Sequence, residues 1–466
     1  MDALEKFDEP TRSIIRFVRA ADWQALQQPV RQGIVRHILD SIGCALFAFH
    51  EAPCVIAREL AAAAPVPNGS SVIGLASRTT PEYATFANGG MIRYLDYNDS
   101  FHSKGYGHPS DMIGGLLAVA EEVNASGADF ALGVYTAYEV FAAIADRVPA
   151  LDLGWDAGLL IGVSTAAGAA KLLDLPPEAI GYAVSLTVAP SVPLAVTRTG
   201  RISPWRGFAA AHSAMNAVFG ARLARRGMLG PDQPFDGIKG LTHKAVPRFS
   251  LGQIGAQGDG RSAVQRSHIK LMPADYEIQA PAEALLALYQ QGLRAEDIKA
   301  INIRTYHLTW EMMGGGQGDH AEKWDPKTRE TADHSLPYLV AVAITDGVVN
   351  HESFSPARFR DPGLRPVMQK VTVQVDPEIE ANWAERPIHK IEITLNDGSR
   401  REIQANPARG HATNPATDAD IERKFLSNAA GVTDQESARR LAQMLWRIEA
   451  LPEISELTAL LRRIGQ

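Results

Sequence analysis

The chain is poor in cysteine, with only Cys44 and Cys54 among its 466 residues. Two thiols exclude a three- or four-cysteine iron–sulfur cluster and a cysteine-based zinc site held by one chain. We expect both cysteines to be buried free thiols, as is usual in a reducing compartment.

The chain also has no block of lysine and arginine, and its net charge is −7. Binding to nucleic acid or to an anionic membrane therefore has no electrostatic support. No segment approaches the about 18 uninterrupted apolar residues that span a bilayer. The first ten residues are acidic and lack the apolar centre of a secretory or transit peptide. We expect a cytoplasmic protein with no nucleic-acid or membrane partner.

Alanine-rich helical periodicity dominates the first half of the chain. Apolar residues at three- and four-residue spacing predict helices over residues 11–21, 29–49, 52–64, 115–123, 130–147, 159–173, 178–186 and 208–226. The second half is mixed, with helices predicted at 281–291, 334–344, 419–430 and 435–448. Alternation predicts strands at 300–306 and 371–375, and a hairpin from 389–395 and 400–404 across an Asn-Asp-Gly-Ser turn.

The length suggests two domains, and a change of composition marks where they divide. Residues 251–267 place four glycines among polar residues, which is typical of a boundary or a mobile crossover. We therefore predict a mainly α fold. A large all-helical domain covers residues 1–268 and is completed by 413–466, and a smaller α+β lid domain covers 269–412.

The densest group of chemically active side chains lies in residues 93–111. Its members are Asp96, Asp99, His102, Lys104, His108 and Asp111. An apolar run follows, with Pro109-Ser110-Asp111 as its cap, so His108 should lie beside a helix N-terminus. Such an end attracts an anion and disfavours a charged imidazole. This predicts a neutral histidine suited to proton transfer on a carboxylated substrate, the alternative being a solvated surface loop.

A divalent metal is a second interpretation of the same segment. Asp96, Asp99, His102 and His108 are all residues that ligate such ions. The glycines and the proline break any regular frame for these ligands, so we expect no metal.

Three further clusters of polar residues stand out. They are Arg198, Arg201 and Arg206; Arg266, His268 and Lys270; and Asp333, His334, Ser335 and Tyr338. Guanidinium groups bind carboxylates in a bidentate manner, so the first cluster suits a di- or tricarboxylate, although solvated surface arginines would look the same. The second cluster lies near the domain boundary, where binding sites often form. In the third, Asp333 or Ser335 also fits as a simple helix cap.

Taken together, several motifs resemble the signature of the MmgE/PrpD family. They are Leu95-Asp-Tyr-Asn-Asp-Ser100, Gly107-His-Pro-Ser-Asp111, Gly154-Trp-Asp156, Ile202-Ser-Pro-Trp-Arg206, Ile269-Lys-Leu-Met-Pro-Ala274 and the segment 324–338. The resemblance spans most of the chain. The family includes 2-methylcitrate dehydratases, cis-aconitate decarboxylases and iminodisuccinate epimerases, and segment 324–338 looks most like the dehydratase branch.

The resemblance implies a helical domain with an α+β lid, a homodimer, and no redox cofactor or iron–sulfur cluster. By similarity, Asp96 is the family's active-site aspartate, Ser100 its usual threonine, His108 its catalytic histidine and Tyr338 an aromatic hydroxyl of the site. Two positions depart from the pattern. Arg206 stands where relatives have a lysine, and Ala157 where many have a histidine.

These features lead to one hypothesis, a cofactor-independent lyase that dehydrates 2-methylcitrate to 2-methyl-cis-aconitate. His108 would move the proton and Asp96 would orient it, while Tyr338 or Ser100 would assist departure of hydroxide. Substrate carboxylates would be bound by Arg206, Arg201 and Lys270, together with His334 and Lys104. The alternatives are decarboxylation or epimerisation of a related di- or tricarboxylate, and a binding homologue with impaired catalysis.

Overall fold

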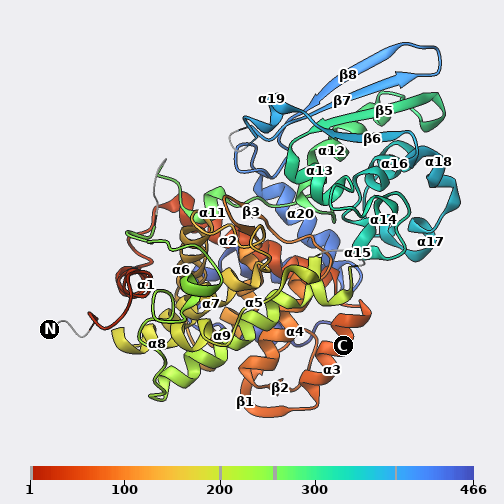
Figure 1. Cartoon of the computed structure of the whole chain (residues 1–466). Coiled ribbons are helices and arrows are strands. Elements are labelled where there is room, and N and C mark those ends of the chain that lie inside the picture. Colours follow the sequence, from red (N-terminus) through yellow and green to blue (C-terminus); the bar gives the residue numbers. More distant parts are fainter. Residues whose placement is uncertain (1–3, 199–201, 256–259, 384–385, 466) are drawn as a thin grey trace. The chain divides into compact units, whose positions relative to one another are not determined.

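The computed structural model describes residues 4–198, 202–255, 260–383 and 386–465 (Figure 1). The chain forms two compact units. The first unit comprises Met1–Thr197, Pro204–Ile269 and Thr417–Gln466, and the second comprises Arg198–Ser203 and Lys270–Ala416. The sequence placed the boundaries at 268/269 and 412/413, and it did not indicate that the short segment Arg198–Ser203 groups with the second unit.

The first unit is almost entirely helical. Its larger helices are α1 (Glu9–Ala20), α2 (Gln28–Phe47), α3 (Ala52–Ala62), α4 (Pro81–Arg93), α5 (Ile113–Glu122), α6 (Gly127–Ala145), α7 (Gly158–Leu172), α8 (Pro177–Val188), α9 (Ala209–Arg225), α20 (Asp418–Ala429), α21 (Gln435–Trp446) and α22 (Ser455–Leu461). Short elements are β1 (Pro65–Ser71), β2 (Arg78–Thr79), β3 (Phe101–His102), β4 (Tyr106–Gly107), η1 (Pro109–Met112), η3 (Pro204–Gly207), α10 (Leu241–Lys244), α11 (Ala263–Arg266) and η7 (Ile448–Ala450). A further turn of 3₁₀ helix, η2, covers Ala195–Arg198.

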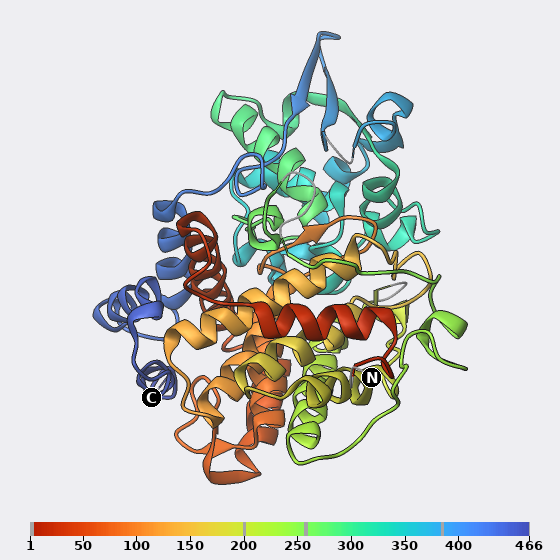
Figure 2. The ribbon, with the colours of Figure 1, turned by 90° about the vertical axis from the view of Figure 1, so that its left-hand side faces the viewer.

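Small residues let the central helices of this unit approach closely. Helices α4, α5, α7 and α9 pack on one another (Figure 1). A methyl group on Gly90 of α4 would come within 2.0 Å of the Phe208 ring, and one on Gly114 of α5 within 2.6 Å of the Gly89 nitrogen. The C-terminal helix α20, blue in Figure 2, lies beside α2, so the end of the chain completes the unit that its beginning starts.

The second unit combines one sheet with short helices. Its elements are α12 (Tyr276–Gln290), η4 (Ala295–Asp297), β5 (Ile298–Thr305), α13 (His307–Met313), α14 (His320–Trp324), α15 (Arg329–Ala332), α16 (Leu336–Asp346), η5 (Glu352–Phe354), α17 (Pro356–Phe359), η6 (Pro362–Leu364), α18 (Arg365–Met368), β6 (Val371–Val375), α19 (Pro377–Glu380), β7 (His389–Leu395) and β8 (Arg400–Ala405). The strand order is β6-β5-β7-β8, with β5 parallel to β6 and the other pairs antiparallel. Alternate residues of β5 and β7, such as Ile303 and Ile391, are fully buried, which gives the sheet one apolar face.

Helix α6 is the one helix in the described ranges that is long and apolar enough by itself to cross a membrane; α2 and α3 pass the same test only together, as a pair bent by 98°. Within the unit, 89% of the apolar window of α6 is buried. It packs against α7, and Ser126 and Asp129 form a capping box at its start. Burial against protein on nearly all sides is the behaviour of a core helix.

The predicted fold class, mainly α with a smaller α+β part, is confirmed. The sequence did not predict helix α4, because the adjacent glycines 89 and 90 suggest a break in a helix. It also treated residues 101–107 as loop, whereas they form the small antiparallel pair β3–β4.

Candidate active site

A two-stranded ribbon in the first unit carries several of the polar side chains that the sequence singled out. In this ribbon, β3 and β4 pair Phe101 with Gly107 and His102 with Tyr106. Side chains alternate between the faces of a strand, and directly opposed residues share a face. Continuing the register by one pair sets Ser100 opposite His108. We name the face that carries Ser100, His102, Tyr106 and His108 the ribbon face.

Ser100 is held at both its main chain and its side chain. Its N–H donates to the carbonyl of His268 at 2.9 Å, and its carbonyl accepts from the His268 N–H at 2.7 Å. Its Oγ lies 2.8 Å from Nε2 of His102. The ring of His102 meets the ring of His268 edge-on, with centroids 5.7 Å apart. The ribbon face therefore joins a serine hydroxyl to a pair of imidazoles.

His108 has a defined tautomer when it is neutral. It is buried, and its Nδ1 lies 2.6 Å from the main-chain carbonyl oxygen of Asp99. A carbonyl oxygen only accepts, so Nδ1 carries the proton and donates it. The lone pair of the neutral ring is then on Nε2, which is the atom able to act as a base.

The sequence predicted that Asp96 orients His108, and the structure shows the main-chain carbonyl of Asp99 as the acceptor of the hydrogen bond from Nδ1. The prediction of an anion site at the following helix end also takes a different form. The N–H and the hydroxyl of Ser110, the second residue of η1, both donate to Oδ1 of Asp99, at 3.1 and 2.6 Å. The anion at this helix end is therefore a carboxylate of the chain itself.

Asp99 is the centre of a fully buried network. Its Oδ2 accepts from the Tyr138 hydroxyl at 2.7 Å and lies 3.0 Å from Nδ1 of His37, whose Nε2 lies 3.2 Å from the Val264 carbonyl oxygen. Burial would raise the pKa of Asp99, but the hydrogen bond and positive charge of His37, with donors on Ser110 and Tyr138, outweigh burial and hold that pKa below its usual value. The network keeps the peptide that orients His108 in place.

Asp96 lies among cations. It forms an ion pair with Arg93, and its Oδ2 lies 3.6 Å from Nη2 of Arg206; all three side chains are buried. Its backbone has a positive φ of 51°, a conformation that is costly for a residue with a Cβ. Nε of Arg93 also lies 3.8 Å from Oδ2 of Asp111, so the two guanidinium groups of this buried cluster face two carboxylates.

A buried lysine from the end of the chain holds the same segment from behind. Lys424 on α20 donates to the main-chain carbonyl of Tyr97 at 2.8 Å and pairs with Asp40 of α2 at 2.6 Å. Burial lowers the pKa of Lys424, but the charge of Asp40 more than compensates and the net direction is upward. Residues 96–100 are thus fixed by groups from α2, α6 and α20.

These supporting residues were not predicted from the sequence. His37, Asp40, Tyr138 and Lys424 stand within helical patterns, where isolated polar residues are common. The available signal was two ionisable groups, His37 and Asp40, three residues apart and separated by Ile38 and Leu39. Ala157, where many relatives have a histidine, lies next to β4, since a Cβ on Gly107 would be 3.0 Å from the Ala157 Cβ.

In the second unit, His334 is held between two carboxylates. Its Nδ1 contacts Asp333 and its Nε2 lies 3.2 Å from Oδ2 of Asp275. Asp333 also pairs with Arg329 at 2.8 Å, and its carbonyl accepts from the Asp275 N–H at 3.0 Å. Two oxygen acceptors on the two ring nitrogens suit the doubly protonated ring. A direct hydrogen bond from His334 to a substrate would replace one of these contacts.

The remaining predicted residues have different environments. Tyr338 is buried in the second unit, and its hydroxyl donates to the Ser353 carbonyl; burial raises its pKa. Lys270, also in the second unit, is 1% exposed. Lys104 is exposed at the turn between β3 and β4. Arg201 lies outside the described residues.

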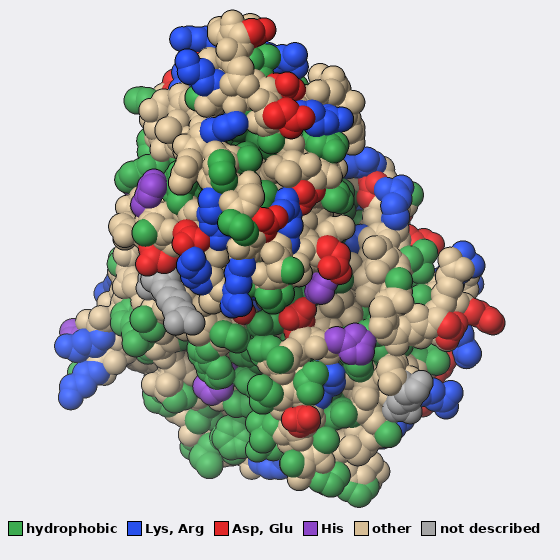
Figure 3. Space-filling model, turned by 90° about the vertical axis from the view of Figure 1, so that its right-hand side faces the viewer, with side chains coloured by type: hydrophobic (Ala, Val, Ile, Leu, Met, Phe, Trp, Pro, Cys, Tyr) green, Lys and Arg blue, Asp and Glu red, His purple; other side chains and the backbone are tan. Residues whose placement is uncertain are grey.

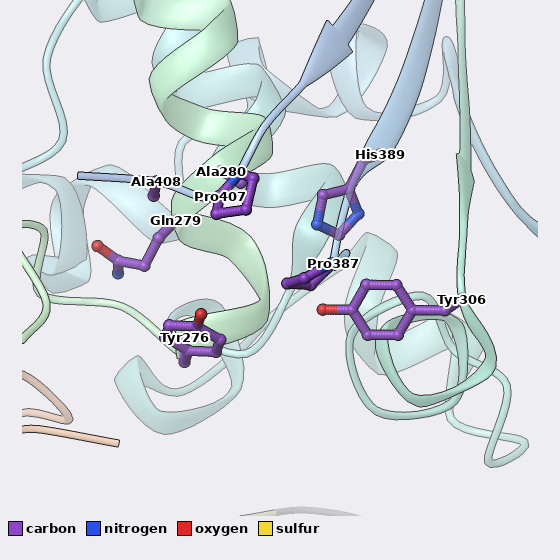
Figure 4. Close-up of a pocket in the computed structure, with 8 residues that line it drawn as sticks. All are labelled: Tyr276, Gln279, Ala280, Tyr306, Pro387, His389, Pro407 and Ala408. Carbon is purple, nitrogen blue, oxygen red and sulfur yellow. The ribbon is translucent and has the colours of Figure 1, made fainter. Parts of the chain in front are cut away.

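The second unit also has a small pocket of its own, shown in Figure 4. It is lined by Tyr276, Gln279, Ala280, Tyr306, Pro387, His389, Pro407 and Ala408. Burial lowers the pKa of His389 to about 3, so this histidine is neutral at ordinary pH. None of these lining residues is a lysine or an arginine. This pocket therefore offers no counter-charge for a polycarboxylate.

Comparison with known proteins gives consistent matches along the chain. The MmgE/PrpD N-terminal domain matches residues 12–253, and the MmgE/PrpD C-terminal domain matches residues 272–450. The 2-methylcitrate dehydratase of Salmonella typhimurium is 28% identical over 424 residues, covering 84% of each chain. That of Cupriavidus necator is 28% identical over 429 residues, covering 84% of each chain. An alkylcitrate dehydratase from a fungal species is 27% identical over 438 residues, covering 84% of this chain and 82% of that one.

Proposed function

Because the chain belongs to the MmgE/PrpD family, we propose that it is a hydro-lyase that dehydrates 2-methylcitrate or a similar alkylated tricarboxylate. The relatives named above support a dehydratase-type role. The observation on which the proposal depends most is His108, because its Nδ1 donates to the Asp99 carbonyl and its Nε2 is left as the basic atom.

The proposed reaction removes a proton and a hydroxyl group from adjacent carbons. Nε2 of His108 takes the proton from the carbon next to a carboxylate, and the electrons of that C–H bond form the C=C bond. The C–O bond of the neighbouring carbon breaks, and the hydroxide leaves as water once it has received a proton. Ser100 is the better donor for that proton, since the Tyr338 hydroxyl already donates to Ser353.

Positive charge would stabilise the carboxylates of the substrate and the negative charge that develops when the proton leaves. We propose Arg206 for this role, since it lies with Arg93 beside Asp96 in the first unit. Arg201, Lys270, His334 and Lys104 are proposed as further substrate-binding residues because of their charge and their family positions. No cofactor is needed for this scheme.

A substrate panel tests the proposal. The purified protein is incubated with 2-methylcitrate, citrate, cis-aconitate and iminodisuccinate, and the products are followed by NMR. We expect 2-methylcitrate to give 2-methyl-cis-aconitate and water with the highest kcat/KM. Itaconate from cis-aconitate would instead identify a decarboxylase, and inversion of iminodisuccinate an epimerase. Thermal stabilisation without turnover would identify a binding homologue.

We also propose that the protein works as a cytoplasmic homodimer. The first unit exposes large apolar side chains, with Ile56 64%, Leu60 50%, Trp205 47% and Phe219 52% exposed. Figure 3 shows hydrophobic side chains gathered on the lower part of the face that it presents, the side on which α3 lies in Figure 1. Contiguous exposed apolar surface favours association. Light scattering of the purified chain should give twice its mass of 50.4 kDa, and a monomer would refute this part.

A further inference from the structure

The ribbon face contains a histidine, His102, that has no role in the dehydration scheme proposed above. His102 is next to the strand pair's turn, is partly buried, and has its Nε2 2.8 Å from Oγ of Ser100. Ser100 is 1% exposed, and its main chain is fixed by two hydrogen bonds to His268. A fixed serine hydroxyl and a neighbouring imidazole nitrogen are the two parts of a proton relay.

We propose that protonated His102 supplies, through the Ser100 hydroxyl, the proton that converts the leaving hydroxide into water. The inference rests on the proposed dehydration and deepens it. A serine hydroxyl alone is a very weak acid, whereas an imidazolium has an ordinary pKa of about 6.5 and matches neutral conditions. His102 acts through Ser100, so it is a positioning residue and proton source, and Ser100 is the group that touches the substrate.

The proton steps balance. His102 gives the proton on Nε2 to Oγ of Ser100, and Ser100 gives its own hydroxyl proton to the departing oxygen as the C–O bond breaks. The carbon-bound proton goes to Nε2 of His108. One molecule of water leaves, and His108 ends protonated while His102 ends neutral. Exchange with solvent returns the proton from His108 to His102 before the next turnover.

The arrangement of the ribbon explains how one short segment supplies both the base and the proton donor of the elimination. Continuing the register of Phe101–Gly107 and His102–Tyr106 sets Ser100 opposite His108, and His102 is two residues from Ser100 on the same face. Base and acid therefore project from one rigid ribbon, with the base fixed by Asp99 and the acid by His268. Two titratable side chains in ring contact with His102 are Tyr106 on the ribbon, with its ring centroid 5.9 Å away, and His268, with its ring centroid 5.7 Å away.

Substitution of His102 by an amide side chain distinguishes the supply of a proton from a hydrogen bond that only positions Ser100. In His102→Gln, the side-chain amide can still donate a hydrogen bond to Ser100 but has no proton to give up. We expect kcat for the hydroxyl substrate to fall about 100-fold with KM within twofold of wild type. The fall in kcat at high pH that accompanies deprotonation of His102 should disappear. His102→Asn is a second variant should the first fold poorly, and exposed His50→Gln is the control.

A change of leaving group provides the decisive readout. For the substrate analogue with fluoride in place of the hydroxyl group, departure depends less on protonation, so His102→Gln should be within about threefold of wild type. In a protein that already carries Ser100→Ala, adding His102→Gln should cause no further fall in kcat. An unchanged kcat and pH profile in His102→Gln, or an equal deficit for both leaving groups, would overturn the relay while leaving the dehydratase proposal intact. A wild-type protein that eliminates neither group would overturn both.

Discussion

His108 in the helical unit and His334 in the α+β unit are both deeply buried, at 4% and 2% exposure, but different oxygen atoms hold them. One nitrogen of His108 meets a neutral main-chain carbonyl, whereas both nitrogens of His334 meet carboxylates. A carbonyl fixes the tautomer without favouring the charged ring, and two carboxylates favour the imidazolium. The charge of the hydrogen-bonding oxygens thus makes His108 suitable as a base and His334 suitable as a fixed cation.

The largest expected effect separates the two histidines by activity. His108→Asn keeps a donor at the position of Nδ1, so the hydrogen bond to Asp99 can persist, but the basic Nε2 is lost. We expect kcat on the preferred substrate to fall by about 10³-fold with little change in melting temperature. Steady-state kinetics and a thermal melt measure both quantities. Turnover near the wild-type level would remove His108 from the role of base.

His334→Asn should act mainly on stability. It leaves the buried carboxylate of Asp275 facing a group that carries no positive charge, and breaking a buried pair on one side costs about 3 kcal/mol. Urea unfolding of the full chain measures this loss. Replacement of Asp275 by Asn in the same protein should recover part of it, because the uncompensated charge is then gone. Wild-type stability in His334→Asn would mean that the ring is neutral.

A smaller expected effect is the pH dependence of stability that comes from one buried glutamate in each unit. Burial raises the pKa of Glu139 in α6 to about 7, against the lowering effect of the hydrogen bond from the Ala263 N–H. Burial likewise raises the pKa of Glu277 in α12 to about 7, against the lowering effect of hydrogen bonds from Tyr306 and Thr309. The folded chain therefore holds these protons more tightly than the unfolded chain. The resulting stability is fully present below about pH 4.5 and is lost as pH rises to about 7.

Replacement of Glu139 by Gln should flatten that pH dependence. The Gln oxygen can still accept from the Ala263 N–H, and we expect the variant to be about 1–3 kcal/mol more stable than wild type at pH 8 and about equal at pH 4. Glu277→Gln should behave alike, and exposed Glu59→Gln should change little. Unfolding curves at both pH values measure the difference. Parallel pH profiles for wild type and Glu139→Gln would show that the pKa of Glu139 is the same in the folded and the unfolded chain.

Local patterns predicted most of the regular elements. Strands β6 and β7 begin and end where alternation placed them, and the Asn-Asp-Gly-Ser turn joins β7 to β8. Helix α12 begins earlier than predicted, at Tyr276 with Asp275 as its cap, because Pro281 is accommodated inside it. Helix α4 was not predicted because its glycines look like a helix break in the local sequence. They are instead required for close packing against Phe208 and α5, and a local pattern contains no information about such distant partners.

The sequence by itself determined the helices of the first unit, the hairpin of the second and the family, because periodicity, turn residues and motif spacing are properties of neighbouring residues. It also pointed to His108 as the residue that moves a proton. Only the tertiary structure decided that the Asp99 carbonyl orients this ring, and that Ser100 faces His102. Those contacts depend on groups from α2, α6 and the segment before Ile269, and hydrogen bonds of about 3 Å form only where the packing of distant segments brings the atoms together.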